Sequence, residues 1–245
     1  MFLKMEIIKK MTERSRVYGN VKVPTIAFFG DSVTQGCFEV FMENERDLQC
    51  ITDYDAVYHS RVRKIFSILF PTVPVNIINA GLSGDNATNA LTRIQRDVLQ
   101  YSPDLTVVCF GLNDANFGEE ALNKYLTSLR GIFKKLSDSG SEIIFMTPNM
   151  MNTYISNRLS PPVLAEQAEK EKRLQTEGFF DAFLDGAKAI CKEFDIPVCD
   201  CYAKWKMLYE NGVDITELLS NKVNHPLREM HLLFAGMLVN TMFEN

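Results

Sequence analysis

Apolar residues follow two alternating patterns along this chain. Five short apolar runs with β-branched and aromatic residues, bounded by turn residues, are typical of buried strands. These runs cover residues 25–29, 73–81, 104–111, 141–148 and 196–201. Apolar residues recur at helical spacing in residues 53–70, 86–101, 119–137 and 179–193, and in a closing helix from near residue 228 to 242. The pattern therefore predicts strands that alternate with helices.

Strands that alternate with helices pair in parallel and are covered by helices on both faces. We therefore predict one α/β domain over residues 1–245, a three-layer α/β/α sandwich around a parallel sheet. Residues 149–178 form a longer segment than a simple connection needs, and their charged middle, LAEQAEKEKRLQ, is typical of a solvent-exposed helix. We interpret this segment either as a lid or rim at the carboxyl edge of the sheet or as a plain exposed excursion.

Composition and charge argue against several classes of function. The 245 residues are 46% hydrophobic, which is enough to fill the core of one large domain. A net charge of −5 provides no basic surface for nucleic acid. The N-terminal residues mix charged with apolar side chains, so no signal peptide is expected, and no apolar run approaches the roughly 18 residues of a membrane span. The sequence leaves open whether the chain forms a homo-oligomer.

The cysteines are best interpreted as free thiols in a reducing compartment, and the cytoplasm is the expected location. There are six of them: Cys37, Cys50, Cys109, Cys191, Cys199 and Cys201. The last two are separated by one residue, which is not the two-residue spacer of a structural zinc pair. Since the chain has only three histidines, we expect no metal site.

Polar residues follow three of the predicted strands, as GDS at 30–32, NAGLSGDNA at 79–87 and GLND at 111–114. The carboxyl ends of parallel strands meet at one edge of a sheet, so Ser32, Gly84 and Asn113 are expected to lie together. A serine nucleophile needs hydrogen-bond donors for the oxyanion that forms, and a glycine N–H and an asparagine side chain can supply them. Each residue has a structural alternative, as a turn or helix-cap serine, a loop glycine or a helix-cap asparagine. Their coincidence at one edge favours the catalytic interpretation.

A nucleophilic serine also needs a base, and the chain offers three histidines. His59 falls within a predicted helix, where a surface or packing role is expected. His231 falls in the first turns of the closing helix and is expected to pack or cap. His225 lies in the polar loop before that helix and is the best candidate for the base.

The four segments GDSVTQG, NAGLSGDNA, GLND and NHPLREMH occur in the order of the four motifs of the SGNH hydrolases, or GDSL-type esterases and lipases, and the chain resembles this family from about residue 24 to 240. The resemblance implies a flavodoxin-like sandwich with a central five-stranded parallel sheet. It implies Ser32 as nucleophile, His225 as base, and an oxyanion hole formed by the Ser32 N–H, Gly84 and Asn113. It implies no cofactor and no metal.

One position departs from the family pattern. Members usually carry an aspartate three residues before the histidine, and this chain has Lys222 there. In a serine triad, replacing that aspartate with asparagine costs about 10⁴ in kcat, because the imidazole takes the wrong tautomer. The replacement could be a backbone carbonyl, a side-chain oxygen of Asn221 or Asn224, or a carboxylate from Asp200, Asp214 or Glu217. We favour a Ser-His dyad with a non-acidic group that orients the histidine.

The resulting hypothesis is a serine esterase that hydrolyses a small-molecule ester of a short acyl group, such as an acetyl ester of a sugar or small alcohol. A thioesterase or a lysophospholipase on the same site is an alternative. A non-catalytic binding module is a weaker alternative, supported only by Lys222. The aromatic residues Phe38, Phe41 and Tyr154 are candidates for the rim of the site, although aromatic residues in such loops more often pack.

Overall fold

The computed structural model describes residues 5–17, 22–44 and 47–244. Within these residues, five parallel strands form the main sheet in the order β4-β1-β5-β6-β7. The strands are β1 (Thr25–Gly30), β4 (Asn76–Gly81), β5 (Leu105–Cys109), β6 (Glu142–Met146) and β7 (Val198–Cys199). The predicted three-layer sandwich with a five-stranded parallel sheet is therefore confirmed.

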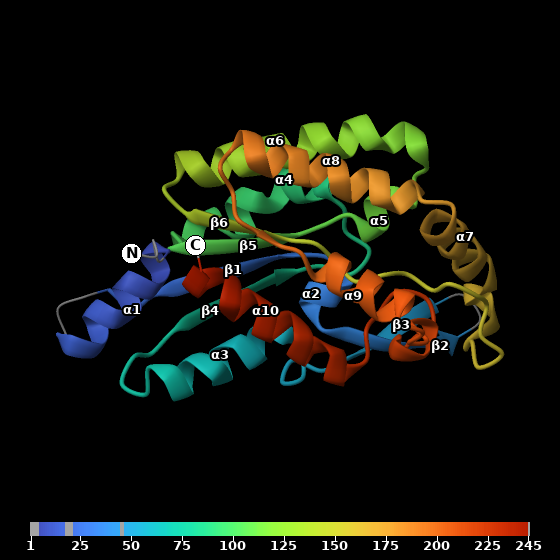
Figure 1. The fold of residues 1–245 in the computed structure, drawn as a ribbon, viewed down its shortest axis with the longest axis horizontal. Coiled ribbons are helices and arrows are strands. Elements are labelled where there is room, and N and C mark those ends of the chain that lie inside the picture. Colours follow the sequence, from blue (N-terminus) through green and yellow to red (C-terminus); the bar gives the residue numbers. More distant parts are fainter. Residues whose placement is uncertain (1–4, 18–21, 45–46, 245) are drawn as a thin grey trace.

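Helices cover both faces of this sheet (Figure 1). On one face lie α4 (Ala87–Asp97), α6 (Leu122–Asp138) and α8 (Phe179–Glu193), and on the other lie α1 (Glu6–Arg16), α3 (Tyr58–Leu69) and α10 (His231–Glu244). Short 3₁₀ turns occur at Leu99–Tyr101, Glu119–Ala121, Pro162–Leu164, Thr216–Leu218 and Arg228–Met230. In α6, the buried residues Tyr125, Leu129, Ile132 and Leu136 repeat at the spacing of one helix face, which is the pattern that predicted this helix.

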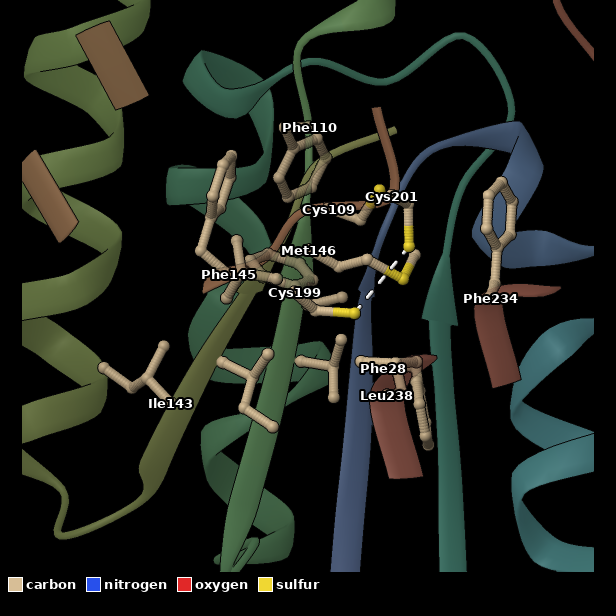
Figure 2. Close-up of a cluster of buried hydrophobic side chains, with 14 of the residues drawn as sticks. Phe28, Cys109, Phe110, Ile143, Phe145, Met146, Cys199, Cys201, Phe234 and Leu238 are labelled. Atoms are coloured by element: carbon tan, nitrogen blue, oxygen red, sulfur yellow. Dashed lines mark hydrogen bonds between the residues drawn. The ribbon is translucent and has the colours of Figure 1, made fainter. Parts of the chain in front are cut away.

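The central strands are fully buried, as a parallel sheet between two helical layers requires. All residues of β1 and β5 are buried. Figure 2 shows part of the core, where Phe28 of β1 lies near Phe234 and Leu238 of α10. The thiols of Cys199 and Cys201 are 3.7 Å apart in the same core. They contribute to packing there.

The two edge strands are shorter than predicted. The β4 strand begins at Asn76 rather than at residue 73, because Pro74 has no N–H for a ladder. The β7 strand contains only two residues, since Asp200 ends it as the N-cap of α9 (Cys201–Glu210). The Asp200 side chain accepts a hydrogen bond from the Ala203 N–H at 3.1 Å. Cys201, predicted as strand, therefore opens a helix.

Three elements at the carboxyl edge of the sheet lie close to the ends of β1 and β5 (Figure 1). They are the antiparallel hairpin of β2 (Cys37–Asn44) and β3 (Asp47–Thr52), the helix α7 (Ala165–Thr176), and α9. The hairpin is largely exposed, so its sequence lacks a clear apolar alternation. Neither the hairpin nor α1 and α9 was predicted from the sequence. The α7 helix was predicted as solvent-exposed, yet Ala168, Glu171, Leu174 and Gln175 form a buried face.

Candidate active site

The sheet edge positions Ser32 at the start of a short helix. The β1 strand ends at Gly30, and Asp31 caps α2 (Ser32–Gln35) by accepting a hydrogen bond from the Val33 N–H at 3.0 Å. Ser32 is the first residue of α2, so its N–H has no partner within the helix. The strand-to-helix turn therefore presents both the hydroxyl and the N–H of Ser32 at the carboxyl edge.

Two glycines allow α2 to sit this close to the sheet. A Cβ at Gly81, the last residue of β4, would lie 2.1 Å from the Gln35 backbone nitrogen. A Cβ at Gly30 would lie 2.7 Å from the Cys109 carbonyl oxygen. Any side chain at either position would displace the turn that carries Ser32.

The loop before α10 brings His225 to Ser32, although the two residues are far apart in the sequence. Ser32 Oγ lies 2.9 Å from His225 Nε2, and both residues are buried. His225 Nδ1 lies 2.8 Å from the backbone carbonyl oxygen of Phe38 in β2. A carbonyl can only accept, so Nδ1 carries the proton and Nε2 of the neutral ring is free to accept a hydrogen bond from the serine hydroxyl.

The Phe38 carbonyl is held in place by Arg228, three residues after the histidine. The Arg228 guanidinium lies 4.4 Å from the centre of the Phe38 ring and binds both carboxylate oxygens of Glu39, at 2.5 and 2.9 Å. It also donates to Asp53 at 3.1 Å. The hairpin and the histidine loop are thus joined by a cation that contacts the two residues around this carbonyl.

Burial lowers the pKa of His225 below its usual value of 6.5. The hydrogen bond to the Phe38 carbonyl and the charge of Glu39 act in the opposite direction but do not offset the burial. The ring is therefore neutral at neutral pH, which is the form that can accept a proton.

The oxyanion candidates line the same cavity as Ser32 and His225. Gly84 has a φ of +74°, a left-handed conformation that favours glycine, and no atom lies within 4 Å of the Cβ that a side chain would add. Its conformation, not a shortage of space, therefore requires glycine. Asn113 lies in α5 (Leu112–Ala115), and its Nδ2 donates to the Asp85 carbonyl at 2.8 Å. The second Nδ2 hydrogen remains available for a ligand.

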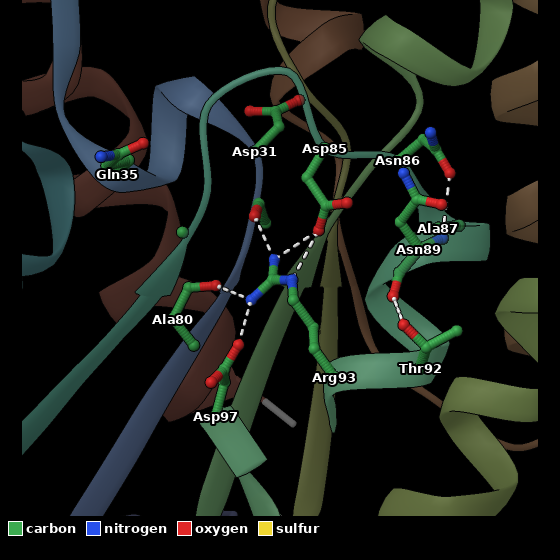
Figure 3. Close-up of polar contacts among 12 residues, drawn as sticks. Asp31, Gln35, Ala80, Asp85, Asn86, Ala87, Asn89, Thr92, Arg93 and Asp97 are labelled. Carbon is green, nitrogen blue, oxygen red and sulfur yellow. Dashed lines mark hydrogen bonds and ion pairs between the residues drawn. The ribbon is translucent and has the colours of Figure 1, made fainter. Parts of the chain in front are cut away.

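A buried arginine supports the loops beneath these residues (Figure 3). Arg93 of α4 pairs with Asp85 at 2.6 Å and with Asp97 at 3.1 Å. Its guanidinium also donates to the Ala80 carbonyl at 2.8 Å and the Gly30 carbonyl at 3.0 Å. Arg93 therefore connects the ends of β1 and β4 to the loop that contains Gly84. An arginine within an amphipathic helix carries no distinguishing signal, so this role could not be predicted from the sequence.

Two further carboxyl groups lie buried at this edge. Burial raises the pKa of Asp31 and of Asp114 to about 7 in each case. Asp114 also accepts a hydrogen bond from the Ala87 N–H at 3.0 Å, so it connects α5 to the start of α4. Repulsion from Asp85 contributes to both shifts, and repulsion from Asp114 adds to the shift of Asp31.

The cavity has a volume of about 740 Å³ and reaches from the hairpin to α7. Among the described residues, none of its lining side chains is an acid, a lysine or an arginine. Amide side chains line much of it: Gln35, Gln49, Asn113, Asn116, Gln167, Asn221 and Asn224. Val40, Leu48, Val163 and Leu164 provide apolar contacts. The site can therefore accept a neutral ligand with both polar and apolar parts.

Lys222 occupies the position of the family aspartate in a left-handed conformation, with φ of +60°. Its ammonium donates to Glu217 Oε2 at 3.1 Å and to the Glu217 carbonyl at 3.2 Å. Of the alternatives considered from sequence, the group at His225 Nδ1 is a backbone carbonyl. Asp200 caps α9, and Asp214 accepts from the Tyr154 hydroxyl at 2.9 Å.

The other two histidines are buried among aromatic rings. His231 Nδ1 accepts from the Tyr58 N–H at 3.1 Å, and burial lowers its pKa to about 3. Burial lowers the pKa of His59 to about 4, and neither ring nitrogen has a hydrogen-bond partner among the described residues. Their positions agree with packing roles.

The rim candidates lie outside the cavity lining. Phe38 is buried, with its ring 5.0 Å from that of His231, so it packs and presents only its carbonyl to the site. Phe41 and Tyr154 are exposed but do not line the cavity.

No group of three or more potential metal ligands occurs in the described part of the chain. Nor does any helix described here have the length and hydropathy to cross a membrane.

The chain is similar to known proteins in both sequence and fold. The model of the GDSL-like Lipase/Acylhydrolase family matches residues 28–233. The chain is 26% identical over 132 residues to an acetylxylan esterase of Geobacillus stearothermophilus, covering 50% of this chain and 58% of that protein. It is 28% identical over 107 residues to an arylesterase of Vibrio mimicus, covering 40% and 52%. The alignments thus span a little over half the length of these relatives.

The fold is shared with solved structures at low sequence identity. A crystal structure of Axe2, an acetylxylan esterase from Geobacillus stearothermophilus, superposes with a TM-score of 0.64 at 22% identity. The superposition covers 91% of this chain and 96% of that one. With the family match over residues 28–233, these findings show that the chain belongs to the GDSL-like Lipase/Acylhydrolase family.

Proposed function

We propose that this protein is a serine esterase that hydrolyses esters of short acyl groups through an acyl-enzyme on Ser32. The observation that carries the proposal is the pair of contacts made by His225. Its Nε2 lies 2.9 Å from Ser32 Oγ, while its Nδ1 is 2.8 Å from the Phe38 carbonyl. The ring is thereby held in the tautomer that can remove the serine proton.

In the proposed mechanism, His225 takes the hydroxyl proton as Ser32 Oγ attacks the ester carbonyl carbon. The oxygen of the tetrahedral intermediate accepts hydrogen bonds from the Ser32 N–H, the Gly84 N–H and Asn113 Nδ2. The imidazolium then gives its proton to the leaving alcohol, which departs and leaves the acyl group on Ser32. A water molecule repeats these steps on the acyl-enzyme, with His225 again as base, and releases the acid.

The substrate we propose is an acetyl ester of a sugar or of a small alcohol. The amide side chains of the cavity can bind hydroxyl groups, and the cavity volume of about 740 Å³ is in the range of small-molecule sites. Two relatives, named as an acetylxylan esterase and an arylesterase, support this class. The described lining has no lysine or arginine, so it offers no cationic partner for a phosphate, which favours a neutral ester over a lysophospholipid.

We also propose that residues 149–178 serve as one wall of the site within a single domain. Val163, Leu164 and Gln167 from this segment line the cavity, which supports a rim rather than an excursion without function.

A cytoplasmic location is supported by the six cysteines, all of which are thiols. The binding partner that we propose for this protein is a small-molecule ester and not a nucleic acid.

The test uses p-nitrophenyl acetate, butyrate and octanoate together with a fluorophosphonate probe. We expect the highest kcat/KM on the acetate, and one equivalent of probe bound per chain. The variant Ser32→Ala should bind no probe and lose hydrolysis while retaining its fold by circular dichroism. Labelling that persists in the variant would exclude Ser32 as nucleophile. A preference for octanoate would favour a lysophospholipase, and a preference for a thioester over the matched oxygen ester would favour a thioesterase. A wild-type protein that is neither labelled nor active would favour a binding module.

A further inference from the structure

Glu171 is a fully buried carboxylate on α7, directly behind the wall of the cavity. We propose that Glu171 is a positioning residue for the esterase site: its carboxylate holds the loop that carries His225 and the short helix that carries Asn113. This inference rests on the function proposed above. It assigns a role in catalysis to the 149–178 segment beyond that of a wall.

One oxygen of Glu171 gathers amide groups from three separate elements. Oε1 accepts from Asn224 Nδ2 at 2.9 Å, from Asn116 Nδ2 at 3.0 Å, and from Gln167 Nε2. All three amide residues line the cavity, whereas Glu171 does not. Asn224 precedes His225, and Asn116 is the C-cap of α5, three residues after Asn113. A single acceptor therefore connects α7 to both sides of the proposed catalytic site.

The contact with Asn224 continues to the backbone of His225. Asn224 Oδ1 accepts from Asn221 Nδ2 at 3.0 Å. Asn221 Oδ1 in turn accepts from the N–H groups of Val223 at 3.0 Å, Asn224 at 2.9 Å and His225 at 2.9 Å. The two ends of this series agree in direction: the ionised Glu171 accepts from Asn224 Nδ2, and the three backbone N–H groups, which can only donate, turn Asn221 Oδ1 toward themselves.

A carboxylate here has a cost that an amide would not have. Burial raises the pKa of Glu171 to about 7, and its second oxygen has no hydrogen-bond partner among the described residues. The gain is an acceptor that can bind several N–H groups at once. A glutamine whose oxygen takes the place of Oε1 would keep an acceptor there without its negative charge, and its two donors would lie where Oε2 has no partner among the described residues. The hydrogen bond from Asn224, and with it the hold on the His225 loop, would then be weaker.

The expected effect falls on the geometry of His225 relative to Ser32. A displacement of about 1 Å at a reacting group can lower a rate about 10²-fold. We therefore expect Glu171→Gln to lower kcat on p-nitrophenyl acetate by about 10- to 100-fold per active site. Titration with the fluorophosphonate gives the number of competent sites, so that a loss of folded protein is separated from a loss of turnover. The matched control is Glu166→Gln, an exposed residue on the same helix, which should leave kcat unchanged.

A double variant tests the bond direction. In Glu171→Gln with Asn224→Asp, the residue at 171 can donate and the one at 224 can accept, while the bond from Asn221 is kept. We expect this exchange to recover part of the lost kcat, a result that a merely structural role for Glu171 does not predict. If Glu171→Gln does not fold, Glu171→Asp replaces it, with an intermediate loss of kcat per site expected from the shortened carboxylate.

The outcomes separate this inference from the proposed function. An inactive, unlabelled wild type would contradict the esterase itself. If the wild type is active, a kcat per labelled site within twofold of wild type in the tested Glu171 variant would overturn the positioning role. So would a loss of labelled sites with unchanged turnover per site. If the double variant Glu171→Gln with Asn224→Asp loses as much kcat as Glu171→Gln alone, the proposed series of hydrogen bonds from Glu171 through Asn224 would be overturned.

Discussion

Replacing Arg93 with methionine tests how strongly the fold depends on a partner for the buried carboxylate of Asp85. The Arg93 and Asp85 side chains are only 7% and 1% exposed, and their charged atoms are 2.6 Å apart. Methionine keeps most of the apolar volume but leaves Asp85 as an unpaired buried charge. Removing one partner of a buried pair typically costs about 3–5 kcal/mol in the free energy of unfolding. The carbonyls of Gly30 and Ala80 also lose their donor, so we expect the loss to lie in the upper part of this range.

The chain offers a matched control and a built-in probe. Arg96 lies on the same helix and also pairs with Asp97, but its side chain is 73% exposed, so Arg96→Met should change stability little. Unfolding in urea can be followed by the fluorescence of Trp205, the single tryptophan of the chain, which is fully buried. A loss below about 1 kcal/mol for Arg93→Met, or one equal to that of Arg96→Met, would refute the assigned importance of the pair.

Further predictions concern the histidines and Lys222. Changing His225 to alanine should lower kcat by several orders of magnitude, on the scale of losing a triad member, whereas the same change at His59 should leave kcat nearly unaltered. Because burial lowers the pKa of His225, the acid limb of the wild-type kcat/KM profile should lie below pH 6.5, and a limb at or above 6.5 would contradict this. His59 has a folded pKa of about 4 against 6.5 when unfolded, so the unfolded chain binds its proton first and stability falls as the pH drops through this window. We expect His59→Phe to reduce that loss between pH 7 and pH 4 by about 3 kcal/mol in urea unfolding, and an unchanged pH dependence would count against it. Lys222→Asp should not raise kcat, since the Phe38 carbonyl already occupies His225 Nδ1, and a severalfold rise would show that the carbonyl orients the ring poorly.

The sheet was predictable because its strands and helices follow two distinct apolar periods. The parallel direction of the strands and the helix α8 at residues 179–193 follow from local pattern and from the rules for parallel sheets. Ser32, Gly84 and Asn113 were likewise predictable as neighbours, since each follows a strand that ends at the same edge. His225 could be selected because few histidines compete with it.

A backbone carbonyl was one of the alternatives for the group at His225 Nδ1, but it could not be singled out, because a backbone carbonyl leaves no mark in the sequence. Every residue has one, and only the placement of the hairpin brings that of Phe38 to the ring. The hairpin itself is largely exposed, and Arg228 contacts it through Glu39 and the Phe38 ring. The buried role of Glu171 was hidden for a related reason. Its helix is so rich in charge that it is typical of a solvent-exposed element, although one face is buried.

A carbonyl in place of a carboxylate at His225 changes the proposed reaction in two opposing ways. It fixes the tautomer as an aspartate would, because it can only accept the Nδ1 proton. It brings no negative charge, however, so the imidazolium that forms as Ser32 attacks is stabilised less. Glu39 is the acid whose charge acts on His225, but it is bound to Arg228, which offsets much of its field. The histidine is consequently a weaker base, so it removes the serine proton with less driving force. It also stays neutral to lower pH, which widens the pH range in which it can act as base. In this arrangement catalysis depends more on geometry than on charge, so the contacts that fix Phe38 and the His225 loop become the decisive ones.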